Sequence, residues 1–310
     1  MTSDSDDGSG QSDTYRIKGS ESAAAAVVRI AQTRLDGALE ELRDGVQKDA
    51  PAAIHEARKD LKKVRSVLRL VRDPLGKDRF QRENARLREA SQALASTRDA
   101  TVKGDTLEAL AERYGDELPD AAKQLERSLD DEHRSAGSEA ELGPATQRAT
   151  VLITEARADV DAWSFSKSGF KLLAGGLERS YRRGYKRFAD VRDDPTPENV
   201  HEWRKRVKDL WYDLRLLRGT WPQVLGQLAD QAHELSDLLG DHHDLTVLSE
   251  DLDGRSEIDG DDATATQALI ERRQEELLEA AVPIGERLYA EPPKMFVERM
   301  RAYWRARNAG

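Results

Sequence analysis

The chain has 310 residues, of which 38% are hydrophobic, 35% charged and 5% aromatic, and it contains no cysteine. No stretch approaches the roughly 20 consecutive apolar residues of a membrane-spanning helix, and the few aromatic residues argue against an all-β sandwich. The missing cysteines exclude disulfides, a thiolate nucleophile and cysteine-bound metals. Because the acidic N-terminus carries no export signal, we expect a cytoplasmic protein.

The formal net charge of −10 argues against a polyanionic partner, but the distribution of charge reverses this inference. Residues 54–72 hold seven Lys or Arg and two acidic residues, residues 177–192 hold six and two, and residues 200–218 hold six and three. Acidic residues gather elsewhere, mainly in the N-terminal tail and in residues 251–262. The sequence therefore predicts a basic site inside an acidic molecule.

The first 18 residues are rich in Ser, Asp and Gly, and we expect them to be disordered. From residue 20 the pattern is helical, with Pro51 and Pro197 in first turns and Pro74 and Pro222 after segments that they cannot extend. No run of alternating polarity predicts a sheet, so the expected fold is all-α. The predicted helices are 20–47, 51–73, 78–94, 100–113, 119–134, 146–163, 169–192, 197–218, 223–239, 245–252, 264–289 and 294–308.

An internal repeat relates the first half of the chain to the second. Residues 54–72 align with residues 200–218 at an offset of 146, with nine identities in 19 positions. Residues 94–102 match residues 239–247 at an offset of 145. Two matched blocks in the same order predict a duplicated helical bundle, with halves that meet near residues 150–168 and are related by a pseudo-twofold axis.

Each copy of the repeated helix has an apolar stripe and an opposite basic face. The stripes, which we expect to pack in a bundle core, are Ile54, Ala57, Leu61, Val64, Leu68 and Val71 in the first copy and Val200, Trp203, Val207, Leu210, Leu214 and Leu217 in the second. The basic faces run over about 21 Å. They consist of His55, Arg58, Lys59, Lys62 and Arg69 in the first copy, and of His201, Arg204, Lys205, Lys208 and Arg215 in the second.

A charged helix face is ordinarily solvated and held by pairs four residues apart. An anion site is favoured here because the face occurs twice and because the nearby acids are expected on other sides of the helix, namely Glu56, Asp60, Glu202 and Asp209. Residues 177–192 add a third basic element, with Tyr185 on its packing side and Arg34 as a partial counterpart on the first helix. Its cations are Arg179, Arg182, Arg183, Lys186 and Arg187.

The adjacent His242, His243 and Asp244 suggest a metal site, but the first copy has Thr97, Arg98 and Asp99 at the matching positions. We therefore interpret Asp99 and Asp244 as helix N-caps. No ligand spacing such as HExxH is present, and we expect neither a metal nor another cofactor. A bound anion would raise the pKa of His55 and His201, so we expect anion binding to weaken as pH rises.

The sequence resembles the CHAD (conserved histidine α-helical domain) family from about residue 20 onward. The resemblance rests on IHEARKDLKKVRSVLRL, STRDATV, YRRGYKRFADVRDDPTPENVHEWRKRVKDLWYDLRLL and LLGDHHDLTVL. It implies two four-helix-bundle-like halves about a pseudo-twofold axis, here residues 19–163 and 164–310 after an acidic tail over residues 1–18, with a basic central cleft. No ExExK motif of the triphosphate tunnel domain of some relatives occurs, so we expect a stand-alone module.

The resemblance also implies non-catalytic binding of inorganic polyphosphate. Two differences make the halves unequal, Lys63 against Asp209 and Arg65 against Trp211. The implied site residues are the two basic faces together with Arg182, Arg183 and Lys186. Alternatives are a metal-dependent phosphohydrolase and a nucleic-acid-binding or scaffold protein, although few aromatic residues are left for base stacking. We expect no membrane partner, and an association with polyphosphate granules in the cytoplasm.

Overall fold

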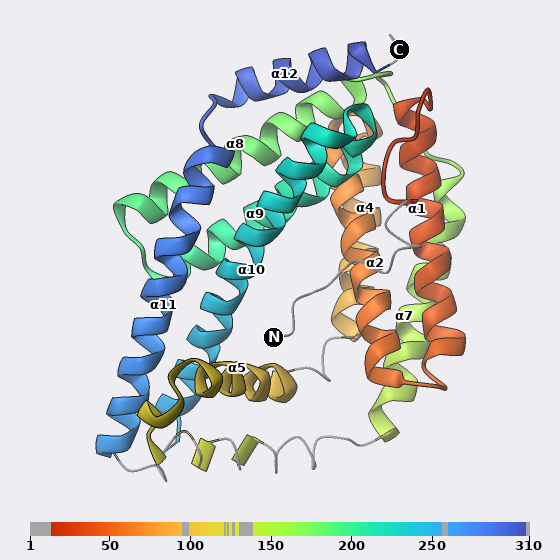
Figure 1. Ribbon diagram of the computed structural model, residues 1–310. Helices are drawn as coiled ribbons and strands as arrows, with labels where there is room; N and C mark the ends of the chain where they lie inside the picture. The colour runs from red at the N-terminus through yellow and green to blue at the C-terminus, as the bar shows by residue number, and fades with distance from the viewer. Residues whose placement is uncertain are drawn as a thin grey trace.

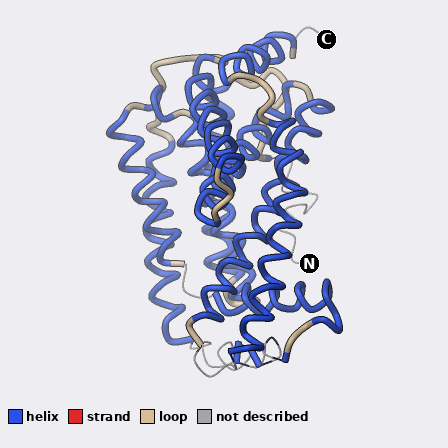
Figure 2. Tube along the Cα trace, turned by 90° about the vertical axis from the view of Figure 1, so that its left-hand side faces the viewer, coloured by secondary structure: helices blue, strands red, loops and turns tan. Residues whose placement is uncertain are grey.

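The computed structural model describes residues 14–94, 99–120, 122, 124–125, 128–129, 139–255 and 260–307. Within these residues every regular element is a helix, which confirms the all-α prediction (Figure 2). None of the described helices combines the length and apolar character needed to cross a membrane. The elements are α1 (Ala23–Glu40), η2 (Glu41–Gly45), α2 (Ala50–Leu70), α3 (Arg72–Leu75), α4 (Lys77–Ala93), α5 (Asp99–Tyr114), η3 (Gly115–Glu117), α7 (Glu139–Val160), α8 (Lys171–Asp193), α9 (Pro197–Leu217), η4 (Arg218–Thr220), α10 (Pro222–Asp253), α11 (Gly260–Leu288) and α12 (Pro293–Ala306).

The first group of packed helices is α1, α2, α4 and α7 (Figure 1). Helix α1 contacts α2 and α7, and α4 contacts the same two helices. Helix α2 begins as predicted, because the Asp49 carboxylate accepts a hydrogen bond from the Ala52 N–H at 3.1 Å and Pro51 lies in the first turn. The whole predicted apolar stripe of α2 is buried, which confirms its orientation.

The second group is α8, α9, α10 and α11, with α12 packed on α8 (Figure 1). Helix α9 starts at Pro197, and the Thr196 hydroxyl accepts a hydrogen bond from the Asn199 N–H at 3.4 Å. Its predicted apolar stripe is also buried, with Trp203 0% exposed. Both copies of the repeated helix therefore turn the predicted side toward a core.

Packing joins the two groups. One apolar cluster includes buried residues of α1, α2, α4, α7, α8, α9, α10 and α11. Helix α5 comes from the first half of the sequence but packs against α10, in a second cluster that includes Leu107, Leu110, Leu248 and Ile270. The predicted pseudo-twofold axis remains a prediction.

Two predicted helices, over residues 223–239 and 245–252, form one continuous helix, α10. Its counterpart in the first half is divided into α4 and α5. Asp244 therefore lies inside a helix, and its interpretation as an N-cap was wrong. Asp99 is the first residue of α5. The predicted helix over residues 119–134 lies largely outside the described residues.

The segment before α1 is packed where the two groups meet. Tyr15 and Ile17 are each 1% exposed, and the Ile17 N–H donates to the Leu216 carbonyl at 3.0 Å. The predicted end of the tail at residue 18 therefore falls too late, because two apolar side chains bury themselves before it. Residues 1–13, the rest of that predicted tail, lie outside the described residues.

Candidate functional site

The residues of the two predicted basic faces, on α2 and α9, are largely sheltered from solvent. Lys59 is buried, and the other nine face residues are half-buried. Long Lys and Arg side chains can bury their aliphatic stems in this way while the charged head stays at the surface. The faces are therefore sheltered sites rather than fully solvated helix surfaces.

Acidic side chains reach these faces, contrary to the expectation from helix geometry. Lys59 pairs with Glu56 at 3.0 Å, and Lys205 pairs with Glu202 three residues earlier. Arg69 pairs with Asp209 of α9 at 2.7 Å. The expectation was wrong because a flexible side chain reaches a neighbour three residues away even when the two Cβ atoms point in different directions.

Lys63 in the first copy and Asp209 in the second occupy equivalent positions, and each is part of an ion pair. In the first copy Lys63 is 2% exposed and pairs with Asp60 at 3.4 Å, while Arg34 pairs with the same carboxylate at 3.2 Å. In the second copy the order of charges is reversed, with Arg206 pairing with Asp209 at 3.1 Å. Arg34, the expected partial counterpart of the third basic element, is 2% exposed and belongs to this buried group.

The two groups of helices meet at α2, α8 and α9. The Arg69–Asp209 pair joins α2 to α9, and Arg179 of α8 pairs with Asp73 at 2.9 Å. Arg179 also donates a hydrogen bond to the Arg69 carbonyl at 3.5 Å. From this junction α2 and α9 separate toward their N-terminal ends (Figure 1).

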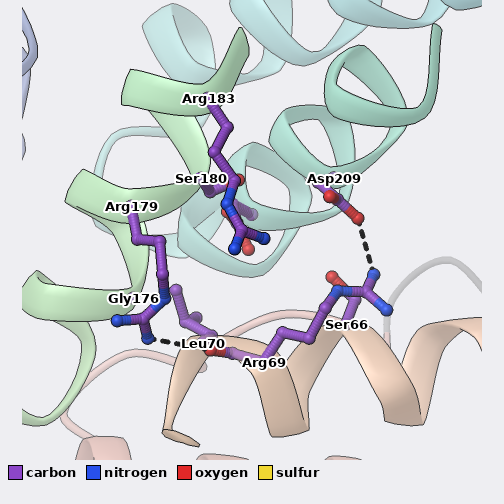
Figure 3. Close-up of a pocket in the computed structure, with 9 residues that line it drawn as sticks. Ser66, Arg69, Leu70, Gly176, Arg179, Ser180, Arg183 and Asp209 are labelled. Carbon is purple, nitrogen blue, oxygen red and sulfur yellow. Dashed lines mark hydrogen bonds and ion pairs between the residues drawn. The ribbon is translucent and has the colours of Figure 1, made fainter. Parts of the chain in front are cut away.

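A pocket of about 30 Å³, here named the junction pocket, lies between these three helices. Figure 3 shows Arg69, Arg179 and Arg183 around it, coming from two of the helices. Burial and the neighbouring guanidinium groups of Arg206 and Arg179 lower the pKa of Arg183. The pocket is lined by Ser66, Arg69, Leu70, Gly176, Arg179, Ser180, Arg183, Asp209 and Asp213. Cations crowded in this way favour an anion between them.

A second grouping lies at the start of α9, where the rings of His201 and His243 are 4.0 Å apart. Burial is the main cause that lowers the pKa of each imidazole to about 4, and Arg204 and Lys205 lower both further. Both rings are therefore neutral at pH 7 in the unliganded protein. They line a pocket with Asp194, Thr196, Pro197, Glu198, Asn199, Thr246 and Glu250.

The remaining predicted site residues are distributed around these two groupings. Arg58 donates to the Leu94 carbonyl at 3.0 Å, and Arg215 lies 5.8 Å from the Tyr15 ring centre and 5.0 Å from that of Trp211. On α8, Lys186 is exposed and Arg182 pairs with Glu178 at 3.5 Å. Tyr185, expected on the packing side, is 41% exposed. His55, Lys62 and Lys208 are half-buried on their helices.

Several residues of this region were not predicted. Arg65 lies near the Arg69–Asp209 pair, and burial together with Arg69 and Arg88 lowers its pKa. Arg206, Asp209 and Asp213 bring one further cation and two carboxyl groups to the junction. The difference between Lys63 and Asp209 at equivalent positions of the repeat was the feature of the sequence that could have indicated these additional charges.

No group of three or more His, Asp or Glu side chains suited to a metal ion occurs among the described residues. His242 is 5% exposed, and burial lowers the pKa of its imidazole. The Gln274 amide donates to the His242 carbonyl at 3.2 Å and to the Thr246 hydroxyl at 2.8 Å. Residues 242–246 of α10 therefore pack against α11.

The buried carboxyl group of Asp213 predicts a pH-dependent stability. Burial raises its pKa from 3.8 to about 8, so unfolding releases a proton between these two pH values. The free energy of unfolding should therefore fall by about 1.4 kcal/mol per pH unit in this window and level off above it. Asp213→Asn should match the wild type near pH 4 and be the more stable protein at pH 8.

Urea unfolding at pH 4 and pH 8 measures this difference. Asp230→Asn, on the exposed side of α10, is the control and should leave the pH dependence unchanged. Equal pH dependence of the wild type and Asp213→Asn would show that Asp213 is not protonated in the native state.

Comparison with known proteins adds to this geometry. The sequence profile of the CHAD domain matches residues 29–253. Two Mycobacterium tuberculosis proteins, Uncharacterized protein MT2285 of strain CDC 1551 / Oshkosh and Uncharacterized protein Rv2226 of strain ATCC 25618 / H37Rv, are each 26% identical over 223 residues. The aligned region covers 67% of this chain and 41% of each relative.

The fold is similar to that of a solved structure, PptA from Streptomyces chartreusis. The TM-score is 0.56 at 14% sequence identity, and the alignment covers 86% of this chain and 98% of the other. At this identity the similarity concerns the fold alone.

Proposed function

Since this chain belongs to the CHAD domain family, we propose that it binds inorganic polyphosphate between the two copies of its basic helix and does not act on it chemically. The observation that carries the proposal is the crowding of arginines where these helices meet. Arg65, Arg69, Arg183 and Arg206 lie around one carboxylate, Asp209, and Arg179 lies near Arg183. A polyanion would relieve the repulsion among them.

A linear polymer suits this arrangement better than a small anion does. The basic faces continue from the junction along both helices, so one chain of phosphates would meet successive cations. Each Lys or Arg of the protein that replaces a counterion of the polymer adds to the affinity, as it does for nucleic acids. Several weak contacts on one chain act together and favour long polymers over single phosphates.

The acidic character of the remaining surface favours binding of a narrow polymer, which fits within the basic region, over binding of a wider polyanion such as nucleic acid. The net charge of −10 would repel nucleic acid that extends beyond the site. We propose that polyphosphate outcompetes single- and double-stranded nucleic acid of equal charge at equal salt. Displacement of a fluorescent polyphosphate by each competitor measures this, and equal displacement by nucleic acid would support the alternative function.

The phosphohydrolase alternative is tested by phosphate release from polyphosphate with Mg²⁺ or Mn²⁺ present. Binding without release is the expected result. Release that is lost in His243→Gln would instead favour the enzyme.

We further propose that the protein acts in the cytoplasm in association with polyphosphate granules.

Binding should be coupled to protonation of the histidine pair. Because His201 and His243 have pKa values of about 4 when no anion is bound, they are neutral at pH 7. The expected weakening of binding with rising pH should therefore occur below pH 7. A bound polyanion raises both pKa values, so affinity should increase as pH falls from 7 to 5, by up to about tenfold per pH unit for each coupled proton.

Titrations of polyphosphate at pH 5, 6 and 7 measure this coupling. The double variant His201→Gln with His243→Gln should lose most of the pH dependence. His233→Gln, which removes an imidazole paired with Asp237 at 2.7 Å, is the control. An unchanged pH dependence in the double variant would contradict the coupling.

A further inference from the structure

The junction pocket has a donor set that suits one small oxyanion. Residues of three helices line it, and its volume of about 30 Å³ leaves room for one small group. Around it lie three guanidinium groups, two serine hydroxyls and two carboxyl groups. Guanidinium groups bind phosphate oxygens in a fork, and hydroxyl groups both donate and accept hydrogen bonds.

Arg183 is the cation most available to a ligand. It has no carboxylate within ion-pair distance among the residues that the structure describes, whereas Arg69 pairs with Asp209 and Arg179 with Asp73. Its side chain extends from α8 toward the pocket (Figure 3). An anion bound beside Arg183 would therefore not have to break an existing ion pair of this residue.

The two carboxyl groups differ in protonation. Asp213 is 4% exposed, and burial raises its pKa to about 8, so it carries a proton at neutral pH and can donate it in a hydrogen bond. Asp209 lies between Arg69 and Arg206, at 2.7 Å and 3.1 Å, and accepts hydrogen bonds. A carboxylate has about four lone-pair sites, so Asp209 can accept a further hydrogen bond from a ligand.

We propose that the junction pocket binds a single protonated phosphate group, supplied either by the end of a polyphosphate chain or by free inorganic phosphate. Arg183 and Arg179 would hold its oxygens, and Asp213 would donate to one of them. Asp209 would accept the hydrogen bond of the P–OH group. The chain-end form rests on the proposed function, whereas the free phosphate form does not.

This donor set discriminates between anions of similar size. A terminal phosphate group loses its second proton near pH 6, so a substantial share of such groups carries a P–OH at neutral pH. Sulfate and the interior phosphates of a chain carry none. An anion without a proton would place its oxygens against the Asp209 carboxylate without a hydrogen bond between them, which is repulsive.

Calorimetric titration of the full chain with inorganic phosphate, sulfate, linear tripolyphosphate and cyclic trimetaphosphate tests this proposal. The cyclic compound has three phosphates but no end group. Linear tripolyphosphate should bind roughly tenfold or more tightly than the cyclic compound, and phosphate more tightly than sulfate. Equal affinities within both pairs would overturn the proposal.

Two arginine substitutions, one in the pocket and one distant from it, provide a matched pair of variants. Arg183→Gln should weaken binding of the favoured ligand by roughly tenfold or more, because it removes a pocket cation. Arg148→Gln on α7 is the control, since the Arg148 side chain is 62% exposed, pairs with Glu89 and does not line the pocket. Equal effects of the two substitutions would overturn the proposal, because general surface charge would then explain binding.

The same titrations separate the two sources of phosphate. If free phosphate binds as tightly as linear tripolyphosphate, the ligand is the free ion. If only the linear compound binds, it is the chain end. Long-chain polyphosphate is titrated in parallel: if it binds while neither phosphate nor linear tripolyphosphate does, only the pocket proposal fails. If long chains do not bind but phosphate follows the expected pattern, only the proposed function fails.

Discussion

Replacing Lys62 and Lys208 together by glutamate should abolish binding of long-chain polyphosphate. The two lysines occupy equivalent positions on α2 and α9, and both are half-buried in the basic faces. Each substitution removes a cation and adds an anion opposite a polyanion. Like charges in a binding interface cost several kcal/mol, so we expect affinity to fall by roughly a thousandfold or more.

The matched control is Lys171→Glu with Lys294→Glu. Both of these lysines are exposed and lie outside the basic faces, at the starts of α8 and α12. This control changes the net charge by the same amount and should reduce affinity only slightly at physiological salt, where distant charges are screened. Circular dichroism checks that both variants are folded. Unchanged titration curves for Lys62→Glu with Lys208→Glu would contradict the assignment of the basic faces.

Gly176→Ala should strongly destabilise the protein, whereas Gly175→Ala should not. A Cβ atom added at Gly176 would lie 1.9 Å from the Leu70 carbonyl oxygen, so α8 would have to move away from α2. Backbone displacement of this kind costs about 1–3 kcal/mol and occasionally more. At Gly175 the nearest atom is an Asp73 carboxylate oxygen at 3.8 Å, which is an ordinary contact. Because alanine favours helices over glycine, Gly175→Ala should gain up to about 1 kcal/mol.

Urea unfolding of both variants measures the difference. The Gly176→Ala substitution also separates the helices that form the junction pocket, so it should weaken phosphate binding there even at temperatures where the protein stays folded. Equal stability of the two variants would mean that α2 and α8 are not packed as closely as the structure has them.

The sequence predicted the helical fold and the orientation of both repeated helices. The stripes that include Leu61 and Trp203 recur at helical spacing, and such a pattern has one way to bury itself. It also predicted the starts of α2 and α9, because the first turn of a helix tolerates a proline such as Pro51 or Pro197. These features depend on neighbours within a few residues.

Contacts between distant segments could not be predicted in this way. Nothing local shows that α5 packs on α10, or that Tyr15 is buried beside Arg215. The Arg69–Asp209 pair joins residues 140 positions apart. Short-range pairs such as Lys59–Glu56 were missed for a different reason, since face geometry places Cβ atoms and not the ends of long side chains.

The structure divides several of the predicted site residues between two places. Arg69 and Arg183 meet at the junction pocket, while His201, Arg204 and Lys205 lie with His243 near the start of α9. A predicted continuous site thus has two groupings along it. One ligand can contact both groupings only if it is a polymer long enough to extend from one to the other.

A salt-series titration with polyphosphate of defined length tests the central claim most directly. If the polymer binds along both basic faces, the logarithm of the affinity should fall linearly with the logarithm of the salt concentration, by roughly 0.7 for each phosphate contacted, and longer chains should show a steeper slope until the faces are filled. An affinity that does not change with salt, or a slope that corresponds to one phosphate at every chain length, would contradict it.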